Sequence, residues 1–273
     1  MDSHHQPIVR VRGLVNRFGS ETVHDGLDLD VFAGEVLGVV GGSGSGKSVL
    51  LNTIVGLNRP KQGEVEVFGT DILSASESEL RAVERRWGVL FQDGALFSSL
   101  TVAQNIEVPL KEFWDMPPRL MDGIAALKIG LAGLPEDAGP KFPAELSGGM
   151  RKRAGLGRAL ALDPEILFLD EPTAGLDPIA AGEFDNLVRD LKSSLGLTVF
   201  MVTHDLDSLF AICDRVAVLV DKKIRIGTLE ELLRDDHPWI RAYFHGPRGR
   251  AAAQAEASHP AEVASAIAGA RSG

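Results

Sequence analysis

Residues 41–48 read Gly41-Gly42-Ser43-Gly44-Ser45-Gly46-Lys47-Ser48 and match the pattern G-x-x-x-x-G-K-[ST] at every required position. The near-continuous apolar run Val36–Val40 comes directly before this turn, and such a run is typical of a strand covered on both faces. The stretch Lys47–Leu57 follows and predicts a helix with apolar residues on one side. This strand–turn–helix context predicts a phosphate-binding loop rather than a flexible Gly/Ser turn that happens to carry a lysine.

Each residue type in this loop has a chemical reason. Glycines let backbone N–H groups turn inward toward phosphate oxygens, and the N-terminus of the following helix adds roughly half a positive charge. Lys47 supplies a point charge for the β- and γ-phosphates of a nucleotide, and the Ser48 hydroxyl can reach Mg²⁺. The loop therefore predicts a site for a nucleoside triphosphate with magnesium.

Two acidic residues end a second apolar strand, Leu167-Phe168-Leu169. Ligands of open α/β sheets bind at the carboxyl edge of the strands, and this strand brings Asp170 and Glu171 to that edge. Asp170 fits the role of holding Mg²⁺ through water, and Glu171 is the candidate general base for an attacking water. The alternative is a pair of solvated acids at a strand end, and the presence of a phosphate loop in the same chain disfavours it.

Two further polar residues follow apolar strands. His204 ends the run Val199–Thr203, and at the same sheet edge it can contact the γ-phosphate and orient the water. Gln92 follows Trp87–Phe91 and could reach the metal or the water. Each residue alone is an ordinary neighbour of a strand, so the prediction depends on their convergence.

A second anion-binding element lies in Leu146-Ser147-Gly148-Gly149-Met150, directly before a helix expected over 151–161. One nucleotide rarely needs two such cradles from a single chain. The second therefore predicts a two-fold dimer in which each copy completes the other's site, although the sequence leaves an arrangement within one chain open.

Composition narrows the class of protein. The 273 residues carry a net charge of −10, which disfavours sequence-independent nucleic-acid binding, and the one cysteine, Cys213, allows no intrachain disulfide. No segment reaches the roughly 18 apolar residues of a membrane span, so we expect any work at a membrane to go through a partner. We expect a flexible N-terminus over residues 1–7 and a loosely ordered Ala/Gly-rich tail over 246–273.

These motifs together resemble the ATP-binding cassette (ABC) ATPases, and the resemblance covers about Ile8 to Phe244. It is carried by six ordered motifs, which look like the Walker A sequence (Gly41–Ser48), the Q-loop (Gln92), the signature motif (Leu146–Met150), Walker B (Ile166–Glu171), the D-loop (Ala174–Asp177) and the switch histidine (His204). It implies that Phe18 and Gly41–Val49 bind ATP, that Ser48, Gln92 and Asp170 hold Mg²⁺, and that Glu171, His204 and Gln92 are catalytic.

The resemblance also implies a fold and an assembly. The fold is an α/β P-loop NTPase over residues 8–245, with a RecA-like mixed sheet, an N-terminal antiparallel β subdomain and an inserted helical subdomain at about 93–160. Two copies would hold two ATP molecules, each between one copy's Lys47 and the other copy's Ser147, Gly148 and Gly149. Met150 stands where the family's signature usually has Gln, which puts a ribose contact in doubt. Phe18 would stack on the base, with a core aromatic as the alternative.

Within the family, Leu90–Val102, Leu146–Met150 and Trp239–Phe244 are similar to the Mla branch (maintenance of lipid asymmetry). That branch implies phospholipid transport between an inner and an outer membrane, with an integral permease, an MCE-domain lipid-binding protein and sometimes a STAS-domain protein as partners. The chain would then lie on the cytoplasmic face of the inner membrane. The alternatives are an importer ATPase for a small polar solute and a soluble non-transport ABC ATPase.

We also expect a groove for a permease helix, lined by Leu96, Phe97, Leu100, Val102 and Ile106, unless these residues form helical core.

Overall fold

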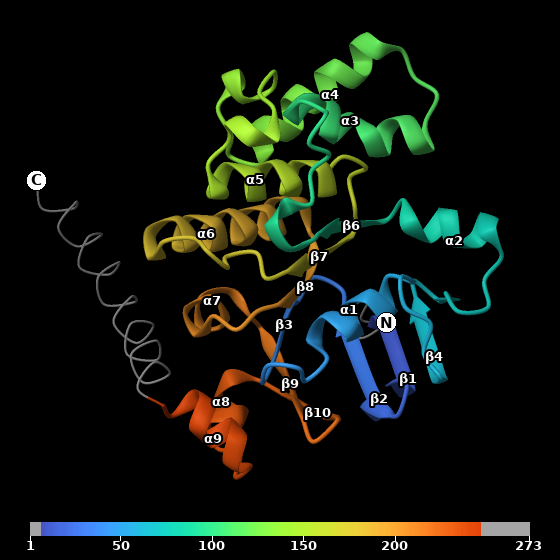
Figure 1. The fold of residues 1–273 in the computed structure, drawn as a ribbon, viewed down its shortest axis with the longest axis vertical. Helices are drawn as coiled ribbons and strands as arrows, with labels where there is room; N and C mark the ends of the chain where they lie inside the picture. The colour runs from blue at the N-terminus through green and yellow to red at the C-terminus, as the bar shows by residue number, and fades with distance from the viewer. Residues whose placement is uncertain (1–6, 247–273) are drawn as a thin grey trace, which may run out of the picture.

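The computed structural model describes residues 7–246, so the expected N-terminus and tail lie outside it apart from Pro7 and Gly246. The fold has three parts: a six-stranded central sheet, a four-stranded antiparallel sheet beside it, and a layer of helices (Figure 1). This is the arrangement that the resemblance implied.

The central sheet runs in the order β10-β9-β3-β8-β7-β6. Its strands are β3 (Val36–Gly41), β6 (Trp87–Leu90), β7 (Ile166–Asp170), β8 (Thr198–Val202), β9 (Arg215–Val220) and β10 (Lys223–Gly227). All neighbouring pairs are parallel except β10 and β9. Every residue of β3, β7 and β8 is buried, as expected of strands covered on both faces.

Helices cover both faces of this sheet. On one face α1 (Lys47–Ile54) packs Leu50, Leu51 and Ile54 into a core shared with Phe168 and Phe200. On the other face α6 (Pro178–Leu195) packs Phe184, Val188 and Leu191 against the alternate residues of β7 and β8. The loops at the carboxyl ends of the parallel strands are thereby held between two layers of helix.

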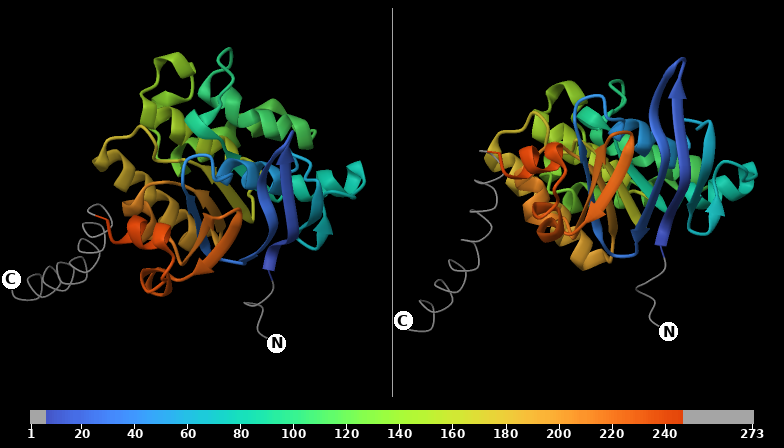
Figure 2. Two further views of the ribbon diagram at one scale, coloured as in Figure 1. Left: turned by 60° about the horizontal axis from the view of Figure 1, so that its bottom comes forward. Right: turned by 90° about the horizontal axis from the view of Figure 1, so that it is seen from below.

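The antiparallel sheet contains β1 (Pro7–Phe18), β2 (Glu21–Phe32), β4 (Gln62–Val67) and β5 (Thr70–Asp71). β1 and β2 pair along most of their length, and register shifts near Gly13, which has a left-handed φ of 57°, interrupt the period-two pattern of β1. Figure 2 shows these two long strands beside the central sheet. Their apolar faces join the core above α1, so the sheet rests on the helix that follows the phosphate loop.

The helical layer contains α3 (Val102–Phe113), α4 (Pro118–Leu131) and α5 (Gly148–Ala159), with short 3₁₀ turns η2 (Gln92–Gly94), η3 (Glu136–Ala138) and η4 (Pro143–Glu145). These helices have their own apolar core. Val102 and Ile106 are fully buried in it, so the prediction that they line a groove is wrong. Their apolar character reflects packing within the helical layer, which was the alternative.

The remaining elements surround the central sheet. They are α2 (Glu77–Glu84), which the sequence analysis missed, α7 (Leu206–Ile212), α8 (Leu229–Leu233) and α9 (Pro238–Phe244). The hairpin of β9 and β10 turns through Asp221 and Lys222, and both residues have positive φ. Among residues 7–246, the structure contains no helix that is both long and apolar enough to cross a membrane.

Candidate functional site

The phosphate loop leaves β3 at Gly41 and enters α1 at Lys47, and close contacts explain its glycines. A Cβ atom on Gly46, whose φ is 96°, would lie 2.3 Å from Val23 and 2.5 Å from the imidazole of His24. A Cβ atom on Gly41 would lie 2.5 Å from the Ser45 hydroxyl and 2.8 Å from the Leu219 carbonyl. The loop can therefore curl tightly only without side chains at these positions.

Lys47 lies across this loop. Its ammonium donates to the carbonyl oxygens of Gly41, at 2.9 Å, and Gly42, at 3.2 Å. Burial lowers the pKa of Lys47, and the nearby carboxylates of Glu171 and Asp170 oppose that shift. The cation is thus held over the glycine backbone at the start of α1.

The hydroxyl of Ser48 donates to Asp170 Oδ1 at 3.3 Å, which joins the phosphate loop to the end of β7. Burial raises the pKa of Asp170, while the Ser48 hydrogen bond opposes the shift. A hydroxyl and a carboxylate side by side offer the hard oxygen ligands that Mg²⁺ prefers. Residues 7–246 contain no cluster of three or more His, Cys, Asp or Glu side chains that could hold a metal ion.

The side chain of Ser45 also shows that the loop suits a phosphate group. Its hydroxyl oxygen is buried in the loop and has no hydrogen-bond partner among the described residues. A buried hydroxyl without a partner is costly, and a phosphate oxygen would accept from it. The loop is therefore shaped and equipped for a phosphate group.

Glu171 and His204 meet at the same edge, as predicted. Glu171 Oε2 and His204 Nδ1 share a hydrogen bond of 2.7 Å, with 17 % of the Glu171 side chain and 66 % of the His204 side chain exposed. The backbone of Glu171 has a left-handed φ of 50°, a strained conformation for glutamate. This pairing leaves the outer nitrogen of the imidazole available to a ligand.

The other residues predicted for the site take several positions. Phe18 is 51 % exposed at the end of β1, so its alternative role as a core aromatic is wrong, while base stacking stays a prediction. Val49 lies in the first turn of α1. Gln92 is exposed in η2 and makes no side-chain hydrogen bond within the described part of the chain. Asp177 caps α6 by accepting from the backbone N–H groups of Ile179 and Ala180.

The signature residues stand at the N-terminus of α5. Ser147 is the N-cap and accepts from the Met150 backbone N–H at 3.2 Å, while Gly148 is exposed. Met150 packs partly into the helical core. Within residues 7–246 no hydrogen bond joins this element to the phosphate loop, so the second cradle stays a candidate for another copy's ligand.

The sequence analysis missed three polar groups that make hydrogen bonds in this part of the molecule. Lys152 is 4 % exposed, and its ammonium donates to the carbonyl oxygen of Glu171 at 2.7 Å. Tyr243 donates to the carbonyl oxygen of His204 at 3.2 Å. Asp185 of α6 accepts from Ser208 of α7 at 2.7 Å, and burial raises the pKa of Asp185 to about 6. The sequence pattern of a helix does not indicate which distant group such a polar side chain will contact.

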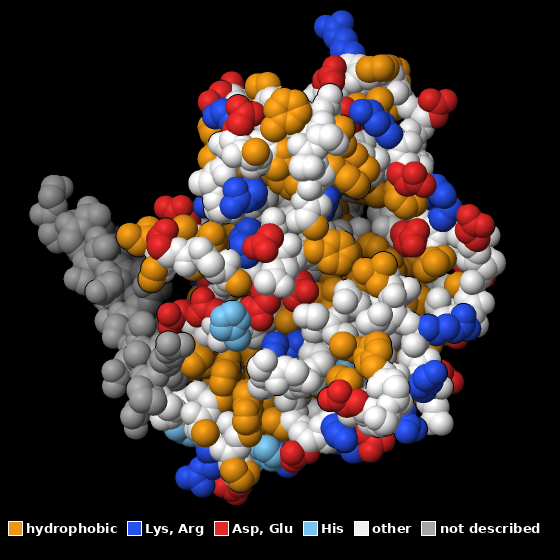
Figure 3. Space-filling view, in the orientation of Figure 1, with side chains coloured by type: hydrophobic (Ala, Val, Ile, Leu, Met, Phe, Trp, Pro, Cys, Tyr) orange, Lys and Arg blue, Asp and Glu red, His pale blue; other side chains and the backbone are white. Residues whose placement is uncertain are grey.

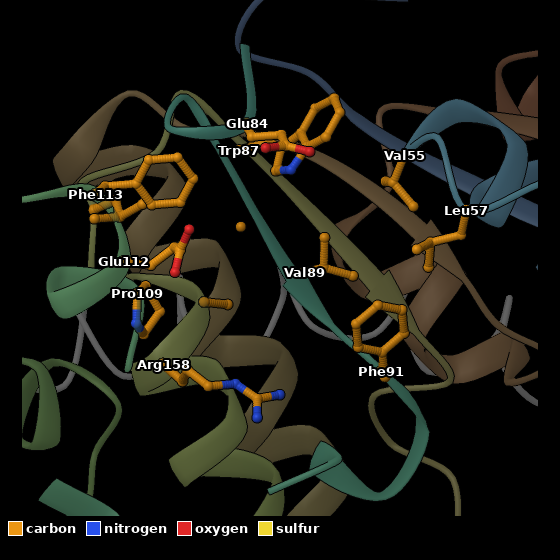
Figure 4. Close-up of a pocket in the computed structure, with 13 residues that line it drawn as sticks. Val55, Leu57, Glu84, Trp87, Val89, Phe91, Pro109, Glu112, Phe113 and Arg158 are labelled. Atoms are coloured by element: carbon orange, nitrogen blue, oxygen red, sulfur yellow. The ribbon is translucent and has the colours of Figure 1, made fainter. Parts of the chain in front are cut away.

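An apolar cleft of about 380 Å³ lies between the helical layer and the central sheet (Figure 4). Its apolar lining includes Leu57, Trp87, Val89, Phe91, Pro109 and Phe113. In Figure 3 hydrophobic side chains gather over this region, between the helical layer and α2. Phe91 directly precedes Gln92, so the cleft adjoins the predicted Q-loop. The residues that line it do not include Leu96, Phe97, Leu100, Val102 or Ile106.

Comparison with known proteins decides the family. The ABC transporter family matches residues 24–174, which include the phosphate loop, the signature residues and the two acids. The chain belongs to the ABC transporter family. The predicted P-loop NTPase fold is confirmed by the ABC transporter cassette MJ0796, which is similar in its dimeric structure with a TM-score of 0.75 and 30 % identity over 81 % of this chain and 98 % of that one.

Two curated relatives from different bacteria are similar over most of the chain. A "probable ribonucleotide transport ATP-binding protein mkl" of Mycobacterium leprae is 41 % identical over 241 residues, covering 88 % of this chain and 69 % of the relative. The "intermembrane phospholipid transport system ATP-binding protein MlaF" of Haemophilus influenzae is 39 % identical over 242 residues, covering 88 % of this chain and 91 % of the relative. The chain is the ATP-hydrolysing subunit of an ABC transporter, and the prediction of an ABC transport ATPase is confirmed.

We expect Lys47→Ala to weaken ATP binding at least about tenfold, because it removes a charge-assisted contact to phosphate. Titration of the full chain with a fluorescent ATP analogue in the presence of Mg²⁺ measures the affinity. Lys61→Ala removes an exposed lysine just beyond α1 and is the matched control, expected to bind like the parent. Equal affinity in the Lys47 variant would contradict the role of the loop.

Proposed function

We propose that this ATPase powers the movement of phospholipid between two membranes. The observation that carries the proposal is the match to MlaF of H. influenzae, at 39 % identity over 91 % of that protein's length. The mkl protein of M. leprae, whose name refers to ribonucleotides, favours a second candidate cargo. Both candidates use the same ATP site and differ only in what the membrane partner carries.

In the proposed reaction, the water oxygen attacks the γ-phosphorus while Glu171 accepts a proton from that water. The bond between the γ-phosphorus and the β–γ bridging oxygen breaks, which releases ADP and phosphate. His204 holds the Glu171 carboxylate through their hydrogen bond and turns its other nitrogen toward the γ-phosphate. Lys47 and the loop N–H groups offset phosphate charge. Mg²⁺, when bound by Ser48 and Asp170 with Gln92 nearby, would neutralise charge on the β- and γ-oxygens.

We further propose a homodimer in which Ser147, Gly148 and Gly149 complete the site of the other copy. The support is the N-terminus of α5, which presents an exposed glycine and a capped turn that no hydrogen bond within residues 7–246 joins to the phosphate loop. A similar cassette forms a dimer in its solved structure. The D-loop residue Asp177 then lies near the shared surface, where it caps α6.

The partners follow from the cleft and from the MlaF match. A permease helix would lay an apolar face into the cleft below the helical layer, in the helix-in-groove mode. An MCE-domain lipid-binding protein, and in some systems a STAS-domain protein, would complete the assembly. The chain would then work peripherally on the cytoplasmic face of the inner membrane. The net charge of −10 gives no support to a nucleic-acid partner.

Glu171→Gln should retain ATP binding and lose turnover by about 10²–10⁴-fold, because the amide cannot accept the proton from water. The variant should also accumulate as an ATP-bound dimer, which size-exclusion chromatography with light scattering detects. Phosphate release measures turnover, and Glu183→Gln, an exposed glutamate on α6, is the control. Hydrolysis at the parental rate would rule out Glu171 as the base.

Leu57→Glu should weaken the permease complex by about tenfold, because Leu57 is 63 % exposed in the cleft and a carboxylate there would lose water when an apolar helix face covers it. Leu127→Glu on α4 changes a leucine that is 59 % exposed outside the cleft, and should leave the complex intact. Co-purification with the tagged permease measures the complex, and ATP affinity checks the fold. Equal loss in both variants would argue against docking in the cleft.

The cargo is tested with the complex in vesicles of phosphatidylethanolamine and phosphatidylglycerol. ATP-dependent movement of a fluorescent phospholipid to acceptor vesicles, absent with Glu171→Gln, would support lipid transport. Uptake of radiolabelled ribonucleotide without lipid movement would favour the second candidate and overturn the lipid proposal.

A further inference from the structure

The catalytic glutamate sits in a backbone conformation that needs support. Its φ of 50° lies in the left-handed region, which costs a β-carbon residue energy and persists only where the surroundings hold it. The Glu171 N–H donates to Val202 of β8 at 2.8 Å, and the Ala174 N–H donates to the Glu171 carbonyl at 3.3 Å. These two bonds come from the central sheet and from the turn that follows.

The third backbone contact comes from the helical layer. Lys152, on the second turn of α5, donates to the same Glu171 carbonyl at 2.7 Å, the shortest of the three. A lysine that is only 4 % exposed is rare without compensation. Here compensation comes from that carbonyl and from the carboxylates of Asp93, Glu171 and Asp170 nearby. The ammonium thus lies among the Q-loop, the end of β7 and the signature helix.

The helix that carries Lys152 is fixed to the Q-loop. A Cβ atom on Gly155 would lie 2.9 Å from the Cα atom of Gly94, so α5 and η2 touch backbone to backbone. Arg158, one turn further on, donates to the carbonyl oxygens of Gly94 at 2.9 Å and Ala95 at 2.7 Å. The same arginine lines the apolar cleft. Lys152 therefore extends from an element that contacts the cleft at one end and carries Ser147 at the other.

We propose that Lys152 is a positioning residue for Glu171: its ammonium holds the strained backbone of the catalytic glutamate in place and ties it to α5. This inference rests on the proposed role of Glu171 as the base. A movement of α5 is thereby passed to the backbone carbonyl of Glu171. Such a movement can begin at the signature residues or at the cleft. Lys152 contacts the backbone carbonyl of Glu171, which takes no part in the reaction, and therefore acts on the base only by positioning it.

The test compares Lys152→Met with Lys152→Arg in the full chain. Methionine matches the length of lysine and removes the cation, and apolar replacement of a buried charge often preserves folding. We expect kcat per nucleotide-binding site to fall at least about tenfold, the scale of one charge-assisted hydrogen bond, with KM for ATP unchanged. Lys152→Arg, which keeps the cation, should recover most of kcat.

Lys128→Met is the matched control. Lys128 lies on α4 in the same helical layer, is 2 % exposed, and donates to Asp163 at 2.5 Å, away from the acids of the site. It should lower thermal stability but leave kcat per binding site unchanged. If Lys152→Met behaves like this control, or raises KM with kcat intact, the lysine is merely structural and the proposal fails.

A double variant separates this proposal from the function on which it rests. Because Lys152 acts through Glu171, Lys152→Met should cause no further loss in a Glu171→Gln background, measured by single-turnover hydrolysis of radiolabelled ATP. A further loss there would overturn the proposal while leaving Glu171 as the base. Parental turnover in Glu171→Gln alone would instead contradict the proposed function.

Discussion

The site depends on three neighbouring parallel strands that end at one edge of the central sheet. β3, β8 and β7 lie side by side, and their registers bring Gly41, the end of β8 and Asp170 to adjacent positions. The phosphate loop, His204 and the paired acids are far apart in the sequence, and the strand order brings them together. The bonds between Ser48 and Asp170 and between Glu171 and His204 then connect the three loops.

Contacts on both sides of this edge hold the phosphate loop and its neighbours in place. The antiparallel sheet presses Val23 and His24 against Gly46 on one side, and a buried chain of hydrogen bonds runs from His24 through Asn16 to Thr53 of α1. On the other side α6 and α7 are joined by Asp185 and Ser208. A loop held in this way presents its N–H groups without the reorganisation that weakens electrostatic stabilisation in water.

The sequence predicted those parts of the fold whose cause is local. The strand before Gly41 follows from its apolar run and the helix after Gly46 from its apolar side, and the structure contains both. The pairing register of β1 and β2 could not be predicted, because bulges shift it at several points. The groove was misplaced for a related reason: Val102 and Ile106 are apolar because they pack inward, and apolar character alone does not show which side of a helix faces a partner.

The residues of the candidate site likewise fall into those that the local sequence predicts and those that depend on tertiary packing. Residues at strand ends, such as Asp170 and His204, could be predicted because parallel strands share an edge. Lys152 could not, because its position five residues after Ser147 says nothing about where its ammonium points, and only the packing of α5 on η2 directs it to Glu171.

Charge explains why a buried lysine is tolerated at that place. Asp170 and Glu171 are adjacent at the end of one buried strand, and two neighbouring carboxylates repel each other in a medium of low polarity. The ammonium groups of Lys47 and Lys152 act on both acids, and each lysine's own pKa is lowered by the burial that this requires. Lys47 belongs to the phosphate loop, so an incoming triphosphate competes for its charge, whereas Lys152 is bonded to the backbone and stays with the acids. Lys152 therefore stays beside Asp170 and Glu171 even when Lys47 is engaged by a phosphate group, and it continues to offset the repulsion between the two acids.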